Sequence, residues 1–308
     1  MRVLVTGSAG FAGPHLIREL LDHDHEVVAF DLNPKAGHLR DIKTFAGDIQ
    51  DSDIVDRVVA EVRPDACIHL SAISFVPEGW ANIRSMFSVN LTGTLNVLEA
   101  FRKSAPEARV LVISSAEVYG SNQRNDLVTE DDAVNPDNPY AISKAAADSV
   151  TLLYAHEYSM HTMTARPGNH IGPGQSSRFV VASFAGQLSA VASGQDGPVR
   201  VGNLDSRRDF TDVRDVARAY RLLIEKGKAG QAYNIASGRT VMVRAVFDEL
   251  CAIAGVRPDI EIDPALFRPA RERALLDIKK IAADVGWRPE VPLSDTLRDI
   301  MADQQTDQ

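Results

Sequence analysis

The sequence predicts an α/β protein built on a doubly wound parallel sheet, with a smaller lobe toward the C-terminus. Short apolar, β-rich runs alternate with amphipathic helical patterns through the first half of the chain. A glycine-rich turn follows the first of these runs at once. After residue 167 the alternation gives way to a segment rich in glycine and proline, where a second lobe can begin. Such alternation is typical of a parallel sheet covered by helices on both faces.

The expected elements fall in a regular order. We expect strands at residues 2–6, 26–30, 43–45, 66–71, 109–113 and 161–166, and helices near 11–22, 51–62, 81–104 and 139–158. We assign residues 1–167 to a dinucleotide-binding domain of Rossmann type, with a returning segment near 205–236. Residues 168–204 and 237–308 then form a smaller lobe that binds substrate.

The glycine turn predicts a binding site for NAD(H) or NADP(H). Strand, turn and helix follow one another directly, so the glycines permit a tight turn and a close approach to a pyrophosphate at the helix N-terminus. Asp31 ends the second strand, where an acid meets the adenosine ribose. A carboxylate there favours a free 2′-hydroxyl and repels a 2′-phosphate, so NAD(H) is preferred over NADP(H). The turn residues expected to contact the cofactor are Gly7, Gly10, Phe11, Ala12 and Gly13.

A proton-transfer site is predicted at the start of the helix near 139–158. Asn138 suits the N-cap and Pro139 the first helical position, which places Tyr140 in the first turn and Lys144 one turn later on the same face. A lysine ammonium and the positive end of the helix dipole both stabilise a phenolate. Tyr140 is therefore a candidate general acid or base.

Composition limits the classes of partner. The net charge is −9 and the pI about 5.4, which argues against nucleic acid or an anionic membrane as the main partner. Cys67 and Cys251 form no disulfide framework, and we predict no metal site. The chain starts on its first strand without a signal peptide or a membrane-spanning segment, so we expect a cytoplasmic protein.

These motifs together resemble the extended short-chain dehydrogenase/reductase family that acts on nucleotide sugars. The resemblance rests on the glycine turn, Ser115 before Tyr119-Gly120, Tyr140 with Lys144, and the run from Arg208 to Asp215. It covers nearly the whole chain. Within the family, the segments Asn169 to Gln175 and Arg208 to Asp215 are most similar to GDP-4-keto-6-deoxy-mannose reductases, which form GDP-D-rhamnose. Their close relatives are the GDP-mannose 4,6-dehydratases.

The resemblance implies particular roles. Ser115, Tyr140 and Lys144 would be catalytic. Asp48 and Ile49 would lie near the adenine, and further cofactor contacts would come from Leu70, Ser71, Ala72, Asn90, Ser114, Tyr140, Lys144 and Pro167. The helices near 81–104 and 139–158 resemble the pair through which relatives dimerise, so a homodimer or a dimer of dimers is expected.

The substrate lobe is expected to hold two phosphates. Planar bidentate donors suit a diphosphate, and arginines of the second half are the candidates, with Asn169 beside them. These arginines are Arg178, Arg208, Arg268 and Arg271.

Glu117 bears on the type of reaction. Dehydratases of the family use a glutamate to remove the C5 proton, and an acid or hydroxyl residue stands just before it. This chain reads Ser115-Ala116-Glu117, which keeps the base and lacks that neighbour. The first interpretation is therefore reduction of the C4 ketone of GDP-4-keto-6-deoxy-D-mannose. GDP-mannose 4,6-dehydratase, nucleotide-sugar 4-epimerase, and a sensor or scaffold that binds NAD(P) without catalysis stay open as alternatives.

Overall fold

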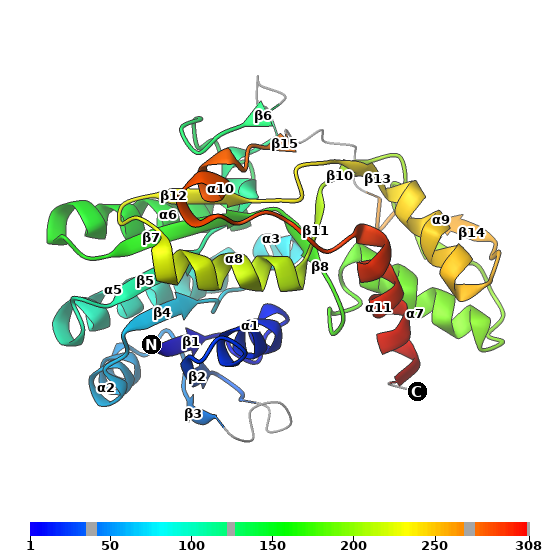
Figure 1. The fold of residues 1–308 in the computed structure, drawn as a ribbon. Helices are drawn as coiled ribbons and strands as arrows, with labels where there is room; N and C mark the ends of the chain where they lie inside the picture. The colour runs from blue at the N-terminus through cyan, green and yellow to red at the C-terminus, as the bar shows by residue number, and fades with distance from the viewer. Residues whose placement is uncertain (35–41, 122–126, 268–274, 307–308) are drawn as a thin grey trace.

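The computed structural model describes residues 1–34, 42–121, 127–267 and 275–306 (Figure 1). Within these residues seven parallel strands form one sheet in the order β12-β7-β5-β4-β1-β2-β3, so the predicted α/β fold with a Rossmann-type sheet is confirmed. The strands are β1 (Arg2–Thr6), β2 (Glu26–Asp31), β3 (Lys43–Ala46), β4 (Ala66–His69), β5 (Arg109–Ile113), β7 (Thr162–Pro167) and β12 (Ala232–Ile235).

Helices cover both faces of this sheet. Successive side chains of a strand point to opposite faces, so Val3 and Val5 of β1 join one hydrophobic core and Leu4 joins the other. The first core is closed by α1 (Ala12–Leu21), α8 (Val213–Lys226) and α10 (Lys279–Val285). The second is closed by α2 (Ser52–Val62), α5 (Gly93–Ser104) and α6 (Pro139–Tyr158).

The single helix expected over residues 81–104 is broken into several pieces. The chain forms α3 (Val76–Ala81), α4 (Ile83–Phe87) and a π-helical turn, η1 (Ser88–Thr92), before α5 begins. Asn82 ends α3 and caps α4 by accepting a hydrogen bond from the backbone N–H of Ser85. Single π-helical turns inside helices are frequent at functional sites, and this one carries Asn90.

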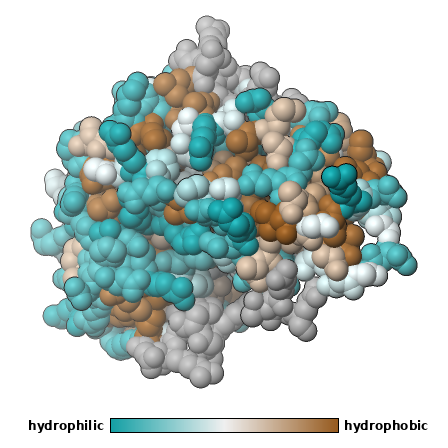
Figure 2. Space-filling model, turned by 45° about the vertical axis from the view of Figure 1, so that its right-hand side comes forward, coloured by the Kyte–Doolittle hydropathy of each residue, from teal (hydrophilic) through white to brown (hydrophobic). Residues whose placement is uncertain are grey.

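A third hydrophobic core lies beside the sheet, in the second lobe. It is built by α7 (Val180–Ala192), α9 (Val243–Ala254) and α11 (Leu293–Thr306), with Phe184 and Phe247 in edge-to-face contact at its centre. Figure 1 shows these helices grouped to one side of the sheet, and on the face drawn in Figure 2 hydrophobic residues are interspersed among hydrophilic ones. Short strand pairs accompany them: β8 (Asn169–Ile171) with β11 (Phe210–Asp212), β9 (Val199–Val201) with β14 (Ile260–Ile262), and β10 (Arg207–Arg208) with β13 (Val241–Met242).

We propose the division into a sheet domain and a second lobe with one change from the expected boundaries. The segment near 205–236 does return to the sheet, through α8 and β12. Residues 275–287, expected in the second lobe, also lie with the sheet: β15 (Leu275–Leu276) pairs with β6 (Leu127–Val128), and α10 and Trp287 pack into the first core. Their apolar pattern alone does not show which of two cores it fills.

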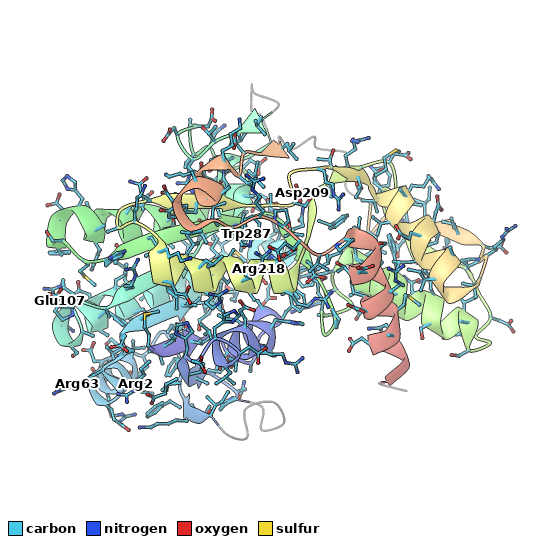
Figure 3. All side chains as sticks on the ribbon, viewed as in Figure 1. Arg2, Arg63, Glu107, Asp209, Arg218 and Trp287 are labelled. Atoms are coloured by element: carbon cyan, nitrogen blue, oxygen red, sulfur yellow. The ribbon has the colours of Figure 1, made fainter. Side chains whose placement is uncertain are left out.

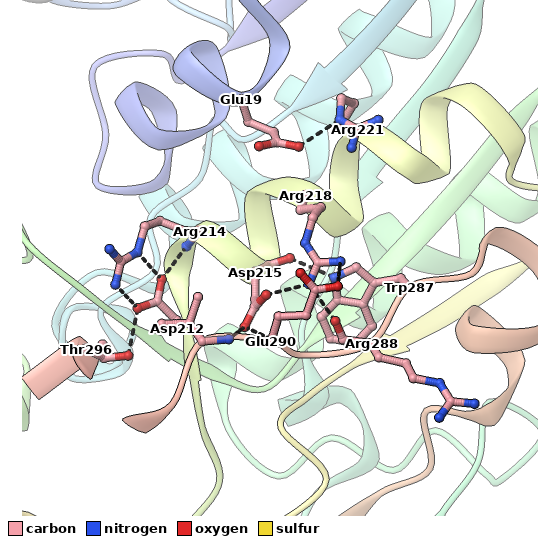
Figure 4. Close-up of polar contacts among 11 residues, drawn as sticks. Glu19, Asp212, Arg214, Asp215, Arg218, Arg221, Trp287, Arg288, Glu290 and Thr296 are labelled. Carbon is pink, nitrogen blue, oxygen red and sulfur yellow. Dashed lines mark hydrogen bonds and ion pairs between the residues drawn. The ribbon is translucent and has the colours of Figure 1, made fainter. Parts of the chain in front are cut away.

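Polar contacts fasten the end of the chain to α8 (Figure 4). The buried carboxylate of Asp215 accepts hydrogen bonds from Arg218 at 2.6 Å and from the backbone N–H groups of Glu290 and Val291 at 2.9 Å. Trp287 donates its indole N–H to the Asp215 carbonyl at 2.8 Å, and Figure 3 places Trp287 and Arg218 side by side along α8. This segment leads into α11, so it couples the first core of the sheet to the core of α7, α9 and α11. Among the described residues no helix has the length and apolar character needed to cross a bilayer.

Candidate active site

The predicted cofactor residues gather at the carboxyl edge of the sheet. The glycine turn follows β1, Asp31 ends β2, Leu70 follows β4, Ser114 follows β5 and Pro167 ends β7. Because these strands are parallel, their carboxyl ends share one edge, which is where ligands bind in open α/β sheets. The sheet order therefore brings together residues that are up to 160 positions apart.

The glycine turn is packed too tightly for side chains. Gly7 has a φ of +69°, and a Cβ there would lie 2.6 Å from the backbone N of Ser71. A Cβ on Gly13 would lie 2.1 Å from the carbonyl oxygen of Ser8. Phe11, the N-cap residue of α1, provides no side-chain cap, so the first turn of α1 is a helix end that suits an anion, although the Gly13 N–H donates to the Gly10 carbonyl at 3.1 Å. This arrangement fits the pyrophosphate of a dinucleotide.

Asp31 lies against the glycine turn. Its Oδ2 accepts a hydrogen bond from the backbone N–H of Ala9 at 2.9 Å, and its Oδ1 accepts one from Asn33 at 3.0 Å. The carboxylate is thus held beside the turn that would carry the pyrophosphate. This position suits the adenosine ribose.

The loop after β3 carries Asp48 and Ile49, the residues expected near the adenine. Asp48 accepts a hydrogen bond from the backbone N–H of Gln50 at 2.9 Å, which folds the loop back on itself. Ile49 is buried, its carbonyl accepts a hydrogen bond from Asn96 at 3.0 Å, and its side chain touches the position of Gly93. Both residues lie next to the carboxyl end of β2, as the resemblance implies.

Asn90 holds the loop after β4. Its Oδ1 accepts from the Ile73 N–H at 2.8 Å, and its Nδ2 donates to the Ile73 carbonyl and to Ser143 Oγ. The loop that carries Leu70, Ser71 and Ala72 is thereby tied to η1 and to α6. The amide group of Asn90 is thus engaged by protein, and it fixes the loop on which the expected cofactor contacts lie.

Tyr140 and Lys144 lie on the buried face of α6. Asn138 caps the helix by accepting a hydrogen bond from the Ala141 N–H at 2.9 Å, as expected. The Lys144 ammonium donates to the carbonyl of Ile113, at the carboxyl end of β5, at 2.5 Å. Burial lowers the pKa of Lys144 to about 8, while the nearby Asp148 acts to raise it. Lys144 thus titrates close to the physiological range, one helical turn from a buried phenol.

Ser115 and Glu117 face the start of the same helix. Ser115 Oγ accepts from the Glu117 N–H at 3.2 Å as the N-cap of a short 3-10 turn, η2 (Ala116–Tyr119), so its own O–H remains a donor. Asn138 Nδ2 donates to Glu117 Oε2 at 3.2 Å, which holds this carboxylate next to the first turn of α6. Ser114 Oγ is a buried side-chain atom that finds no hydrogen-bond partner among the described residues, as expected of a group that meets a ligand.

The predicted substrate residues are arranged less closely. Asn169 of β8 donates to the backbone carbonyl of Asp209 at 3.2 Å, which places it beside Arg208 of β10. Arg178 lies elsewhere, over the ring of Phe75 and 3.3 Å from the carboxylate of Glu78. Arg268 and Arg271 lie outside the residues that the structure describes.

Asp209 anchors the second lobe. Figure 3 shows it between the sheet and the group of helices α7, α9 and α11. Its carboxylate accepts hydrogen bonds from the backbone N–H groups of Ser237, Gly238 and Arg239. Burial raises the pKa of Asp209, and these donors oppose the rise. The run from Arg208 to Asp215 therefore supplies structural acids as well as a candidate phosphate ligand.

Two features at the site escaped sequence reasoning. The imidazole of His170 stacks on the ring of Phe11 in the glycine turn, with centroids 5.9 Å apart, and so joins the second lobe to the cofactor turn. A buried ion pair between Asp148 and Arg166 lies behind Lys144. The i, i+4 spacing of Lys144 and Asp148 was the available signal that a carboxylate lies one turn after Lys144 on the same helix face.

Comparison with known proteins agrees with this geometry. A family model described as GDP-mannose 4,6 dehydratase matches residues 4–300. The GDP-6-deoxy-D-mannose reductase of Pseudomonas aeruginosa is 36% identical over 99% of this chain and 97% of its own. A solved structure of RMD from Pseudomonas aeruginosa complexed with NADPH superposes with a TM-score of 0.87 at 34% identity and covers 99% of both chains.

Epimerases have the same fold. The UDP-glucose 4-epimerase of Thermus thermophilus, solved with NAD, superposes with a TM-score of 0.89 at 32% identity, again over 99% of both chains. The match to the family model over nearly the whole length is decisive. The chain belongs to the GDP-mannose 4,6 dehydratase family, within the short-chain dehydrogenases/reductases.

Proposed function

We propose that this protein reduces the C4 ketone of GDP-4-keto-6-deoxy-D-mannose with NAD(P)H and forms GDP-D-rhamnose. The observation that carries the proposal is that Lys144 of α6, one turn after Tyr140, donates to Ile113 at the carboxyl end of β5, and that Ser115 follows this strand, at the same edge of the sheet as the glycine turn. Ala116 lies between Ser115 and Glu117. The similarity to a GDP-6-deoxy-D-mannose reductase over nearly both full lengths supports it.

The residues of the site have distinct roles in this reaction. When bound, NAD(P)H supplies the hydride that reduces the ketone carbon. Ser115 donates its O–H to the ketone oxygen as negative charge develops there. Tyr140 gives its phenolic proton to that oxygen, which completes the alcohol. The Lys144 ammonium stabilises the phenolate that Tyr140 becomes, and a proton from solvent restores the phenol.

The cofactor follows from the residues of the turn. Gly7 and Gly13 leave room for a pyrophosphate, and Asp31 occupies the ribose position. Neighbours of this fold were solved with NADPH or NAD. We propose NAD(P)H as the reductant, with Asp31 favouring the form that lacks the 2′-phosphate.

The substrate residues proposed are Asn169 and Arg208, with Arg178, Arg268 and Arg271 as further candidates. Asn169 of β8 donates to the backbone carbonyl of Asp209, the residue after Arg208 of β10, so the two candidates lie close together. Arg178 pairs with Glu78 of α3 on the exposed surface, where a diphosphate would compete for the guanidinium.

Self-association is proposed as well. The outer face of α6 exposes Ile142 and Leu153, and α6 packs beside α5. A helix pair with such a face suits a two-fold interface between identical chains. Replacing both residues with glutamate should convert a homodimer into a monomer in size-exclusion chromatography with light scattering, and an unchanged mass would exclude this face.

A GDP-mannose 4,6-dehydratase is the second candidate, and Glu117 favours it. Its carboxylate is held by Asn138 at the start of α6, where it could remove a C5 proton. The test gives the purified protein two substrates in parallel: GDP-4-keto-6-deoxy-D-mannose with NAD(P)H, and GDP-mannose with NAD alone. The proposal expects cofactor oxidation in the first and no 4-keto product in the second. The opposite result would establish the dehydratase. Activity with neither, in a protein that binds cofactor, would favour an epimerase, a sensor or a scaffold.

A further inference from the structure

A buried ionic cluster lies directly behind the proposed catalytic pair. Asp148 of α6 and Arg166 of β7 are 2% and 4% exposed. Arg166 Nε meets Asp148 Oδ2 at 2.9 Å, and its Nη2 meets Oδ1 at 3.1 Å. This is a bidentate pair, in which both carboxylate oxygens are engaged. The reaction proposed above makes no use of either residue.

The cluster is held rigidly from the other side. Arg166 Nη1 donates to Tyr119 Oη at 2.9 Å and to the carbonyl of Glu130 at 3.2 Å. Tyr119 in turn donates to Asn234 Oδ1 at 2.7 Å, and the guanidinium lies 5.1 Å from the centroid of the Tyr119 ring. Arg166 is therefore held next to the Asp148 carboxylate.

Asp148 also faces Lys144. The two residues are four apart on α6, so they lie on the same buried face, one turn from each other. Burial penalises the ammonium of Lys144, and an adjacent carboxylate is the kind of group that opposes this penalty. On α6, Lys144 thus lies one turn after the proposed proton donor Tyr140 and one turn before the carboxylate of Asp148.

Four other titratable side chains of the described residues lie around the cluster. His69 approaches Lys144 from β4, and burial together with the Lys144 charge lowers its pKa to about 3. Tyr119 approaches Asp148 from η2, and burial raises its pKa to about 12. Glu130 lies beyond Arg166, and its pKa is raised by burial. Tyr140 is the remaining neighbour of Lys144, on the same helix.

We propose that Asp148, held in place by Arg166, is a positioning residue that keeps the buried Lys144 ammonium charged and so keeps the Tyr140–Lys144 pair ready for proton transfer. The proposal deepens the proposed function and rests on it for its catalytic meaning. Its electrostatic part concerns Lys144 alone.

The size of the effect follows from the titration of Lys144. With a pKa of about 8, roughly nine in ten Lys144 side chains are charged at pH 7. Opposite charges at short range shift a pKa by about 1–3 units. A loss of one unit would leave roughly half of the Lys144 side chains charged at pH 7.

Direct titration of Lys144 tests the proposal. Protein labelled with ¹³C at the lysine Cε position contains eight lysines, and Lys144 is identified as the resonance absent from Lys144→Met. In the unmodified protein this resonance should titrate near pH 8, well below the ordinary lysine value of about 10.4. In Asp148→Asn its midpoint should fall by about one unit, and in Asp148→Glu, which keeps the charge, it should stay near that of the unmodified protein.

A merely structural role predicts the opposite sign. If Asp148→Asn only loosens the interior and admits water, the midpoint of Lys144 should rise toward the ordinary lysine value of about 10.4. A rise, or no change, in folded Asp148→Asn would overturn the proposal. If this variant does not fold because Arg166 is left unpaired, the double variant Asp148→Asn/Arg166→Gln removes both charges. Its midpoint should still fall, by a smaller amount, and a rise or no change there would also overturn the proposal.

Kinetics then separates this inference from the proposed function. In the reductase assay, Asp148→Asn should lower kcat at pH 7 and leave the KM for cofactor nearly unchanged, with recovery in Asp148→Glu. If the protein shows no reductase activity but the Lys144 midpoint falls as expected, the proposed function fails and the electrostatic role of Asp148 stands. If reductase activity is present and the Lys144 midpoint does not fall, the proposed function stands and the electrostatic role of Asp148 fails.

Discussion

The third glycine of the turn gives the sharpest test of the cofactor site. In Gly13→Ala the new Cβ would lie 2.1 Å from the carbonyl oxygen and 2.5 Å from the carbonyl carbon of Ser8. Real Cβ atoms keep at least 3.0 Å from such neighbours, so the backbone at Ser8 has to move by about 1 Å. Ser8 lies inside the turn that would hold the pyrophosphate. A misplacement of about 1 Å in a positioning element can lower the reaction rate by about 100-fold.

We therefore expect the Kd of NADPH and NADH for Gly13→Ala to rise by about 10- to 100-fold. Overpacking should also destabilise the fold by about 1–3 kcal/mol. Isothermal titration calorimetry measures the first effect and thermal unfolding the second. Gly10→Ala is the matched control for folding, because a Cβ there would meet only the Gly7 carbonyl oxygen at 3.2 Å, and its Tm should stay close to that of the unmodified protein. A folded Gly13→Ala that binds cofactor with unchanged affinity would refute this account of the turn.

Three further predictions concern single acids. Asp31→Asn keeps an acceptor for the Ala9 N–H but removes the charge, so the affinity for NADPH relative to NADH should rise by about fivefold or more. Titrations with both cofactors measure this, and an NADPH-to-NADH ratio of Kd that is the same in the variant and the unmodified protein would contradict the role of Asp31. Asp215→Ala leaves two backbone N–H groups without their acceptor and removes one partner of Arg218, which keeps Glu290 and the Arg288 carbonyl, so it should lower the free energy of unfolding by about 2–4 kcal/mol in urea denaturation, with a smaller loss in Asp215→Asn. A loss below about 1 kcal/mol would show that this pair does not couple the cores. Burial would raise the pKa of Asp212, but hydrogen bonds from Arg214 and Thr296 outweigh it and lower the pKa. Asp212 therefore stabilises the fold above the ordinary carboxyl value of about 3.9, and this stabilisation is lost as pH falls through the lower folded pKa. The difference in stability between the unmodified protein and Asp212→Asn should be present at pH 7 and shrink below pH 4; a difference that does not change with pH would contradict the pairing.

The parts that the sequence predicted well are those governed by local physics. The glycine turn, Asp31 at the end of β2, and Tyr140 with Lys144 on α6 depend on short-range order: strand then turn then helix, or an N-cap followed by an i, i+4 pair. The structure has each of these elements within one or two residues of its expected position. The carboxyl edge of a parallel sheet then brings them together without further information.

The parts that the sequence did not reveal depend on contacts between distant residues. The π-helical turn at Asn90 is accompanied by hydrogen bonds to Ile73 and Ser143, 17 and 53 positions away. The return of α10 and Trp287 to the sheet involves Asp215, 72 positions earlier. Periodicity shows which face of an element is apolar, but it does not show which core that face joins.

The second role of Asn138 shows the same limit. Its capping bond to Ala141 was expected from the N-cap preference. Its bond to Glu117, 21 positions earlier, was not, although this contact places the carboxylate beside the reacting pair. Asn138 therefore contacts Glu117, the base of the dehydratase interpretation, and caps the helix that carries Tyr140, the acid of the reductase interpretation.

The fate of a labelled hydride tests the central proposal most directly. The protein is given GDP-4-keto-6-deoxy-D-mannose and NAD(P)D that carries deuterium at the transferable position, and the product is examined by NMR, with Tyr140→Phe in parallel. The account predicts deuterium at C4 of a GDP-6-deoxyhexose, and almost no product from Tyr140→Phe although it still binds cofactor. Absence of deuterium at C4, or equally rapid incorporation by Tyr140→Phe, would contradict reduction at the Ser115, Tyr140 and Lys144 site.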